Sequence, residues 1–134
     1  MAVHPQVKRI AFIGSARTGM AIQRMAAEVA VKNITLELGG KTPMIVFPDV
    51  NVSDVVTAAI QGMNFTWQGQ SCGSTSRLLL HESIYNEVVS QLAERIDAMR
   101  VGNPMDEASE MGAINSQGQY EKVMGTNPSY YQKL

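Results

Sequence analysis

The stretch "LELGGKTP", residues 36–43, places a lone carboxylate, Glu37, at the end of an apolar run and two glycines directly after it. Its Gly-Gly-Lys-Thr segment is at first sight similar to the end of a Walker A phosphate loop. That loop needs an earlier glycine where this chain has Thr35. Pro43 also disfavours the helix that must follow such a loop, because it restricts Thr42 and lacks an N–H group. We therefore exclude a triphosphate loop, and Glu37 needs another explanation.

The segments on either side alternate between strand and helix patterns. Short β-forming runs predict strands, and apolar residues at helical spacing predict helices, with Ser53 and Ser83 as N-caps. From residue 101 onward the pattern predicts loops. This alternation with short connections is typical of an α/β fold. The predicted strands are 9–13, 34–38, 43–47 and 77–81, and the predicted helices are 18–31, 54–65 and 83–99.

Composition excludes several classes of function. The chain has 134 residues, of which 45% are hydrophobic and 17% charged, as in globular domains with a packed core. A formal net charge of −1 gives no electrostatic reason to bind nucleic acid or an anionic membrane. No apolar run approaches the roughly 18–20 residues that span a bilayer. The N-terminal residues lack the apolar stretch of a signal peptide, so we expect a cytoplasmic location.

The segment "FIGSARTG", residues 12–19, has the context of a dinucleotide-binding turn, because it ends a strand and opens a helix. Gly14 would permit the tight turn, Ser15 would offer its hydroxyl to a phosphate, and Gly19 would let the helix pack closely. Ala16 stands where the pattern has its middle glycine. The alternative is an ordinary glycine turn into a helix.

Glu37 then has three possible roles. It ends the strand that follows this helix, where a dinucleotide site places the acid that binds the ribose. It could instead be a general base beside a cleft that Gly39 and Gly40 keep open. The third interpretation is a solvent-facing glutamate on an edge strand.

Cys72 is the only cysteine, so no internal disulfide can form. A lone cysteine is usually a small buried side chain, but "GQSCGS", residues 69–74, is a loop of small and polar residues. Backbone N–H groups in such a loop can stabilise a thiolate and the oxyanion that forms when it attacks a carbonyl group. His4 and His81 are interpreted as structural or solvated. A cysteine nucleophile with a carboxylate base is the pairing that remains.

These residues carry a resemblance to a known family. "LELGGKTP" at 36–43 resembles the glutamate signature of the aldehyde dehydrogenase superfamily. The run from Phe65 to Arg77 resembles its cysteine signature, F-x-x-x-G-Q-x-C-x-x-x-[ST]-R. "GSARTG" resembles the family's phosphate turn, and "RVGNPMDEASEMGAI" at 100–114 resembles the stretch that follows the cysteine helix. The signatures stand in the family's order, and the resemblance covers roughly residues 1 to 124.

The resemblance implies a function and a set of site residues. The implied reaction is NAD- or NADP-dependent oxidation of an aldehyde to a carboxylic acid through a cysteine thioester. Cys72 matches the nucleophile and Glu37 the general base, and no metal is implied. The implied cofactor-binding positions are Gly14, Ser15, Gly19, Leu38 and Gly39.

The resemblance also implies that the chain is a central piece of a longer fold. Residues 1–40 would be the C-terminal part of the NAD(P)-binding domain, and residues 41–134 the N-terminal part of the catalytic domain. The implied partners are a small aldehyde and a second copy of the chain. A non-catalytic fragment that serves only as a structural or interaction piece is the alternative. Trp67 would line an aromatic-binding tunnel or anchor the core.

Overall fold

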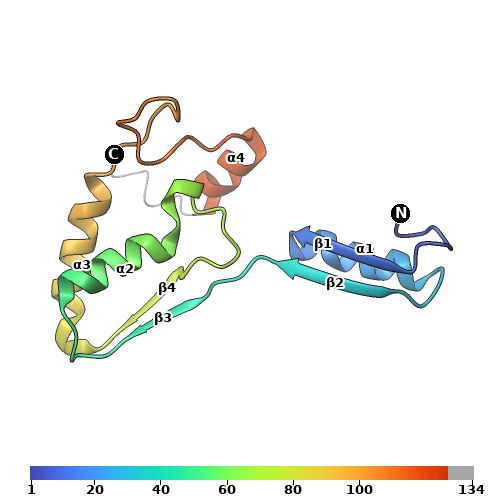
Figure 1. Cartoon of the computed structure of the whole chain (residues 1–134), viewed down its shortest axis with the longest axis horizontal. Helices are drawn as coiled ribbons and strands as arrows, with labels where there is room; N and C mark the ends of the chain where they lie inside the picture. The colour runs from blue at the N-terminus through green and yellow to red at the C-terminus, as the bar shows by residue number, and fades with distance from the viewer. Residues whose placement is uncertain (127–134) are drawn as a thin grey trace.

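The structure, a computed structural model, describes residues 1–126. It contains two strand–helix–strand units joined by an extended connector, residues 39–42, as Figure 1 shows. Each unit holds one pair of parallel strands. The predicted α/β class is therefore confirmed. The predictions that fall on residues 127–134 lie outside the described residues.

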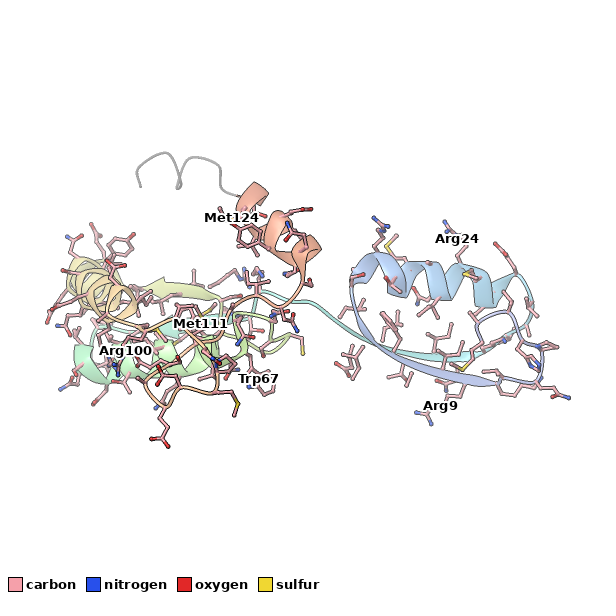
Figure 2. All side chains as sticks on the ribbon, turned by 90° about the horizontal axis from the view of Figure 1, so that it is seen from above. Arg9, Arg24, Trp67, Arg100, Met111 and Met124 are labelled. Atoms are coloured by element: carbon pink, nitrogen blue, oxygen red, sulfur yellow. The ribbon has the colours of Figure 1, made fainter. Side chains whose placement is uncertain are left out.

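The first unit consists of β1 (Arg9–Gly14), α1 (Ala16–Ala27) and β2 (Asn33–Leu38). The strands pair in parallel from Arg9 opposite Asn33 to Gly14 opposite Leu38. Helix α1 covers one face of this pair, and Arg24 on the helix and Arg9 on β1 point away from each other (Figure 2).

Gly19 lets α1 approach β2 closely, as the sequence predicts. It is buried, and a Cβ atom there would lie 3.0 Å from Leu38 Cδ2 and 3.3 Å from Leu36 Cδ1. Any larger side chain would have to displace these leucines, because packed interiors leave no spare volume.

Helix α1 ends earlier than predicted, which corrects the range 18–31. It stops at Ala27, and Glu28 is its C-cap. The valines that follow are β-branched and lose rotamer freedom in a helix. The chain must also turn here, since the N–H of Asn33 donates to the carbonyl oxygen of Lys8 at the start of the strand pair (3.0 Å).

The second unit consists of β3 (Pro43–Val46), α2 (Val52–Met63), the short 3-10 helix η1 (Phe65–Trp67), β4 (Arg77–Leu80) and α3 (Glu82–Asp97). Strand β3 follows the connector directly, so no helix follows "GGKT" and the exclusion of a triphosphate loop is confirmed. Strands β3 and β4 pair in parallel from Pro43 opposite Arg77 to Val46 opposite Leu80. The core lies between this pair and helices α2 and α3, and consists of Val46, Val55, Val56, Ile84 and Val88.

Both predicted N-caps in this unit are wrong by two residues. Asn51 caps α2, since its side-chain oxygen accepts from the N–H groups of Ser53 (2.9 Å) and Asp54 (3.3 Å). His81 caps α3, since its Nδ1 accepts from the N–H of Ser83 (3.2 Å). Both serines lie inside the first turn, where their backbone N–H groups donate to the cap side chains.

A further helix, α4 (Gln117–Thr126), lies in the segment that we predicted to be loop-like. It has no buried residue. Local hydrogen bonds stabilise it instead. The Ser116 hydroxyl accepts from the N–H of Gln119 (3.2 Å), and Gln117 Nε2 donates to Glu121 Oε1 (2.9 Å). Among residues 1–126 no helix is long and apolar enough to cross a membrane.

Candidate active site

The two units and α4 border one cleft of about 470 Å³. It lies where β1 and β2 end, where the connector begins and where the loop after η1 turns back toward β4, a junction visible in Figure 1. Its lining residues come from segments far apart in the sequence: Ile13, Gly14, Ser15, Ala16, Glu37, Leu38, Gly39, Gly40, Lys41, Gly69, Gln70, Ser71, Cys72 and Lys122.

This cleft brings together all but one of the seven catalytic and cofactor-binding residues that the resemblance implies. Six of them line it, and Gly19 does not, because Gly19 is buried between α1 and β2. Gly19 thus acts on the cleft only through the packing of the helix. The six are Gly14, Ser15, Glu37, Leu38, Gly39 and Cys72.

The turn from β1 into α1 presents a helix N-terminus to the cleft. Ser15 is the N-cap, and its Oγ accepts from the N–H of Thr18 (3.2 Å). The earlier N–H groups of a helix have no partner within the helix, and the first turn of α1 contains no acidic residue that would repel an anion. A Cβ atom at Gly14 would lie 2.6 Å from Phe12 Cζ, so a side chain there would have to displace the Phe12 ring. This turn can therefore accept a phosphate group.

Glu37 is exposed and lies near the end of β2, opposite Ile13 of β1. Side chains alternate along a strand. Leu36 and Leu38 face α1, and Glu37 points to the other face. There it is exposed and lines the cleft.

Cys72 is exposed, as predicted, in the loop between η1 and β4. The N–H of Ser74 donates to the carbonyl oxygen of Ser71 (3.4 Å), which closes a turn around Cys72 and Gly73. The connector passes directly beside this turn, because a Cβ atom at Gly40 would lie 3.4 Å from the Cys72 carbonyl oxygen. The cysteine loop therefore lies in van der Waals range of the residues that follow Glu37.

Two lysines that the sequence reasoning missed also line the cleft. Lys41 belongs to the connector and Lys122 to α4. Together they give the cleft two cations beside the carboxylate of Glu37, a balance that favours anionic groups. No sequence signal marked Lys122, because it lies in the segment predicted to be loop-like.

Trp67 lies on η1, where its side chain is 62% exposed (Figure 2). The interpretation of Trp67 as a core anchor is therefore wrong. It is also not among the residues that line the cleft. Within residues 1–126 no group of three or more His, Cys, Asp or Glu side chains could hold a metal ion.

Comparison with known proteins shows the family to which this chain belongs. The family model described as "Aldehyde dehydrogenase family" matches residues 1–130. The chain belongs to the aldehyde dehydrogenase family. It is 43% identical over 124 residues to the peroxisomal aminoaldehyde dehydrogenase 2 of Pisum sativum. It is 44% identical over 124 residues to the chloroplastic betaine aldehyde dehydrogenase of Beta vulgaris.

Solved aldehyde dehydrogenase structures confirm the fold. Betaine aldehyde dehydrogenase from Staphylococcus aureus, solved in complex with NAD+, superposes with a TM-score of 0.90 at 34% identity. The match covers 99% of this chain and 26% of that one. Each plant relative is likewise matched over 92% of this chain and 24% of its own length. The chain therefore spans about a quarter of the aldehyde dehydrogenases it matches.

Proposed function

We propose that this chain carries the nucleophile, the general base and part of the cofactor site for NAD(P)-dependent oxidation of an aldehyde to a carboxylic acid. The observation that carries the proposal is the single cleft lined by Cys72, Glu37 and the Gly14–Ser15 turn. Family membership supports it, and so does the NAD+ complex of the Staphylococcus aureus relative.

The residues present fit a nicotinamide dinucleotide. The Gly14–Ser15 turn and the start of α1 would hold phosphate, for the reasons of geometry and charge given above. Leu38 and Gly39 would lie on the nicotinamide side of the cleft. Bound NAD(P)+ would supply the acceptor for the hydride that leaves the substrate carbon.

Cys72 and Glu37 would divide the remaining chemistry between them. The Cys72 thiolate would attack the aldehyde carbon and form a C–S bond, and backbone N–H groups of the 71–74 turn would stabilise the oxyanion. Loss of hydride from that carbon leaves a thioester on Cys72. Glu37 would then take a proton from water as the water attacks the thioester. The C–S bond breaks, which releases the carboxylic acid and regenerates the thiolate.

Other properties follow from the same proposal. Residues 1–40 would belong to the cofactor domain and residues 41–134 to the catalytic domain, and copies of the chain would associate. The names of the relatives cover aminoaldehydes, betaine aldehyde and hydroxyisobutyraldehyde, so we propose aldehydes as a class of substrate. The names of the two plant relatives place one in peroxisomes and the other in chloroplasts, and a cytoplasmic location for this chain stays a prediction.

A second candidate is a non-catalytic piece that acts through its surface. The observation that favours it is the open face of the β3–β4 pair, where the apolar side chains of Ile45, Phe47 and Leu79 are exposed. Packing against another protein surface would bury them.

Acyl transfer to the purified chain tests the proposal and separates the two candidates. Nitrophenyl acetate should acetylate Cys72 faster than it acetylates a small free thiol. The reaction should release nitrophenol and add the mass of one acetyl group to the chain. Cys72→Ala should abolish the adduct. Reduction of NAD+ or NADP+ on addition of an aldehyde is the second measurement. Acylation no faster than that of a free thiol, together with no cofactor reduction, would leave only the non-catalytic candidate.

A further inference from the structure

We propose that the C-terminus of α2 clamps the cysteine loop and that Ser74 is a positioning residue for Cys72. This inference rests on the proposed role of Cys72 as a nucleophile. Nothing in the signature motifs assigns a function to Ser74 or to the end of α2. The contacts between the two segments carry the inference.

Ser74 is the first part of the clamp. Ser74 is 3% exposed, and no other polar or charged residue among residues 1–126 is buried. Its Oγ donates to the carbonyl oxygen of Met63, the last residue of α2, over 2.8 Å. Carbonyl groups in the last turn of a helix have no partner within the helix. Ser74 therefore satisfies one of them and fixes the loop to the helix end.

Gly62 and Thr75 form the second part. The N–H of Thr75 donates to the carbonyl oxygen of Gly62 (2.9 Å). A Cβ atom at Gly62 would lie 2.3 Å from Thr75 Oγ1, so a side chain at this position would have to displace the Thr75 hydroxyl. Beyond the clash with this hydroxyl, the nearest side-chain atom is Thr75 Cβ at 3.5 Å, an ordinary contact.

The other side of the cysteine is tied to the same helix end. Asn64, the C-cap of α2, has a left-handed backbone conformation (φ 55°, ψ 50°). Its Nδ2 donates to Ser71 Oγ over a long 3.5 Å. The turn that carries Cys72 is thus held before and after the cysteine, while the thiol itself stays exposed.

The clamp has a chemical consequence, because hydrogen bonds to the helix end restrict the positions that the loop can adopt. The 71–74 turn must hold its N–H groups and the thiol in one arrangement beside the connector at Gly40. Misplacement of reacting groups by about 1 Å can cost a hundredfold in rate. Ser74 would therefore act on the orientation of Cys72 and not on its accessibility.

The first test compares Ser74→Ala with Ser76→Ala. Ser76 Oγ is buried in the same loop and makes no hydrogen bond among residues 1–126, which makes it a matched control. Ser74→Ala should slow acetyl transfer from a nitrophenyl ester to Cys72 by about tenfold to a hundredfold. Alkylation of Cys72 by iodoacetamide, which needs only an exposed thiol, should stay within about twofold. Ser76→Ala should match the unmodified chain in both reactions.

The second test is a rescue. Gly62→Ala should slow acetyl transfer, because the added methyl group pushes Thr75 and the loop away from the helix. Thr75→Ala should have no effect, since the Thr75 hydroxyl makes no hydrogen bond among the described residues. The double variant Gly62→Ala/Thr75→Ala should recover the rate, because the atom in the way is gone. A general loss of folding would not be reversed in this manner.

Hydrogen exchange at the Thr75 amide separates failure of the clamp from failure of the proposed function. If the unmodified chain shows no acyl transfer beyond a free thiol, the nucleophile proposal fails and exchange alone judges the clamp. Faster Thr75 exchange in Ser74→Ala than in Ser76→Ala supports the clamp. Equal exchange in the two variants overturns the clamp. If the unmodified chain does transfer the acyl group, an equal rate of transfer in the Ser74→Ala variant also overturns it.

Discussion

At the scale of single residues, Glu37 shows how alternation along a strand assigns a role. Its neighbours Leu36 and Leu38 pack against α1, whereas Glu37 faces the cleft that Cys72 also lines. The spacing of a dinucleotide fold would make Glu37 a ribose ligand. The family resemblance implies a general base instead, and that is the role proposed above.

Glu37→Gln separates these two roles. An amide cannot take a proton from water, so the acetyl adduct on Cys72 should accumulate and its hydrolysis should slow by about two to four orders of magnitude. Cofactor affinity should change little. Intact-protein mass after quenching measures the adduct, and cofactor titration measures the affinity. Glu28→Gln, a carboxylate at the C-cap of α1, is the control. A weakened cofactor affinity with normal hydrolysis would falsify the base assignment.

At the scale of elements, helix starts are decided by side chains just outside the helices. The side chains of Asn51 and His81 accept hydrogen bonds from the N–H groups of Ser53 and Ser83. Serine is as good a cap as asparagine in general, so propensity alone cannot choose between neighbouring candidates. The position at which the chain leaves β3 or β4 determines which residue has the extended backbone of a cap.

Asn51→Ala and Ser53→Ala test this assignment. Loss of the Asn51 side chain leaves two N–H groups of α2 without their acceptor, and the free energy of unfolding should fall by about 1 kcal/mol. Ser53→Ala should change it by less than about 0.5 kcal/mol. Urea denaturation followed by circular dichroism measures both. An equal or larger effect of Ser53→Ala would return the cap to the position predicted from the sequence.

At the scale of the whole molecule, one face of the β3–β4 pair is covered and the other is open. Helices α2 and α3 pack over the core on one side (Figure 1). On the other, Ile45 and Leu79 are register partners that are 63% and 49% exposed. Exposed apolar patches of this kind mark surfaces that associate. We therefore expect the chain to self-associate through this face.

Ile45→Lys/Leu79→Lys tests the surface without entering the core. Light scattering of the unmodified chain should show a mass above the 14.6 kDa of one copy, and the double variant should shift it toward one copy. Val31→Lys is the control, because Val31 is 100% exposed and lies in the other unit. A single-copy mass for the unmodified chain would contradict the expectation.

The sequence by itself determined the α/β class, the positions of most elements and the family. Strands and helices follow from local apolar periodicity, and the exposure of Cys72 follows from the small and polar residues around it. Six residues of the cleft could also be named in advance, because their motifs are short and contiguous. Exclusion of a triphosphate loop likewise rested on local residues, Thr35 and Pro43.

Tertiary structure alone decided the features that depend on contacts between distant segments. Helix α4 has no buried residue and lies where the sequence predicts loops, and only the folded chain shows it and places Lys122 in the cleft. The end of α1 is set by the return to β2, and the clamp of Ser74 on Met63 joins residues that no local pattern relates. Periodicity reports which face of an element is buried, whereas the partner that buries it and the cleft between partners exist only after the chain has folded.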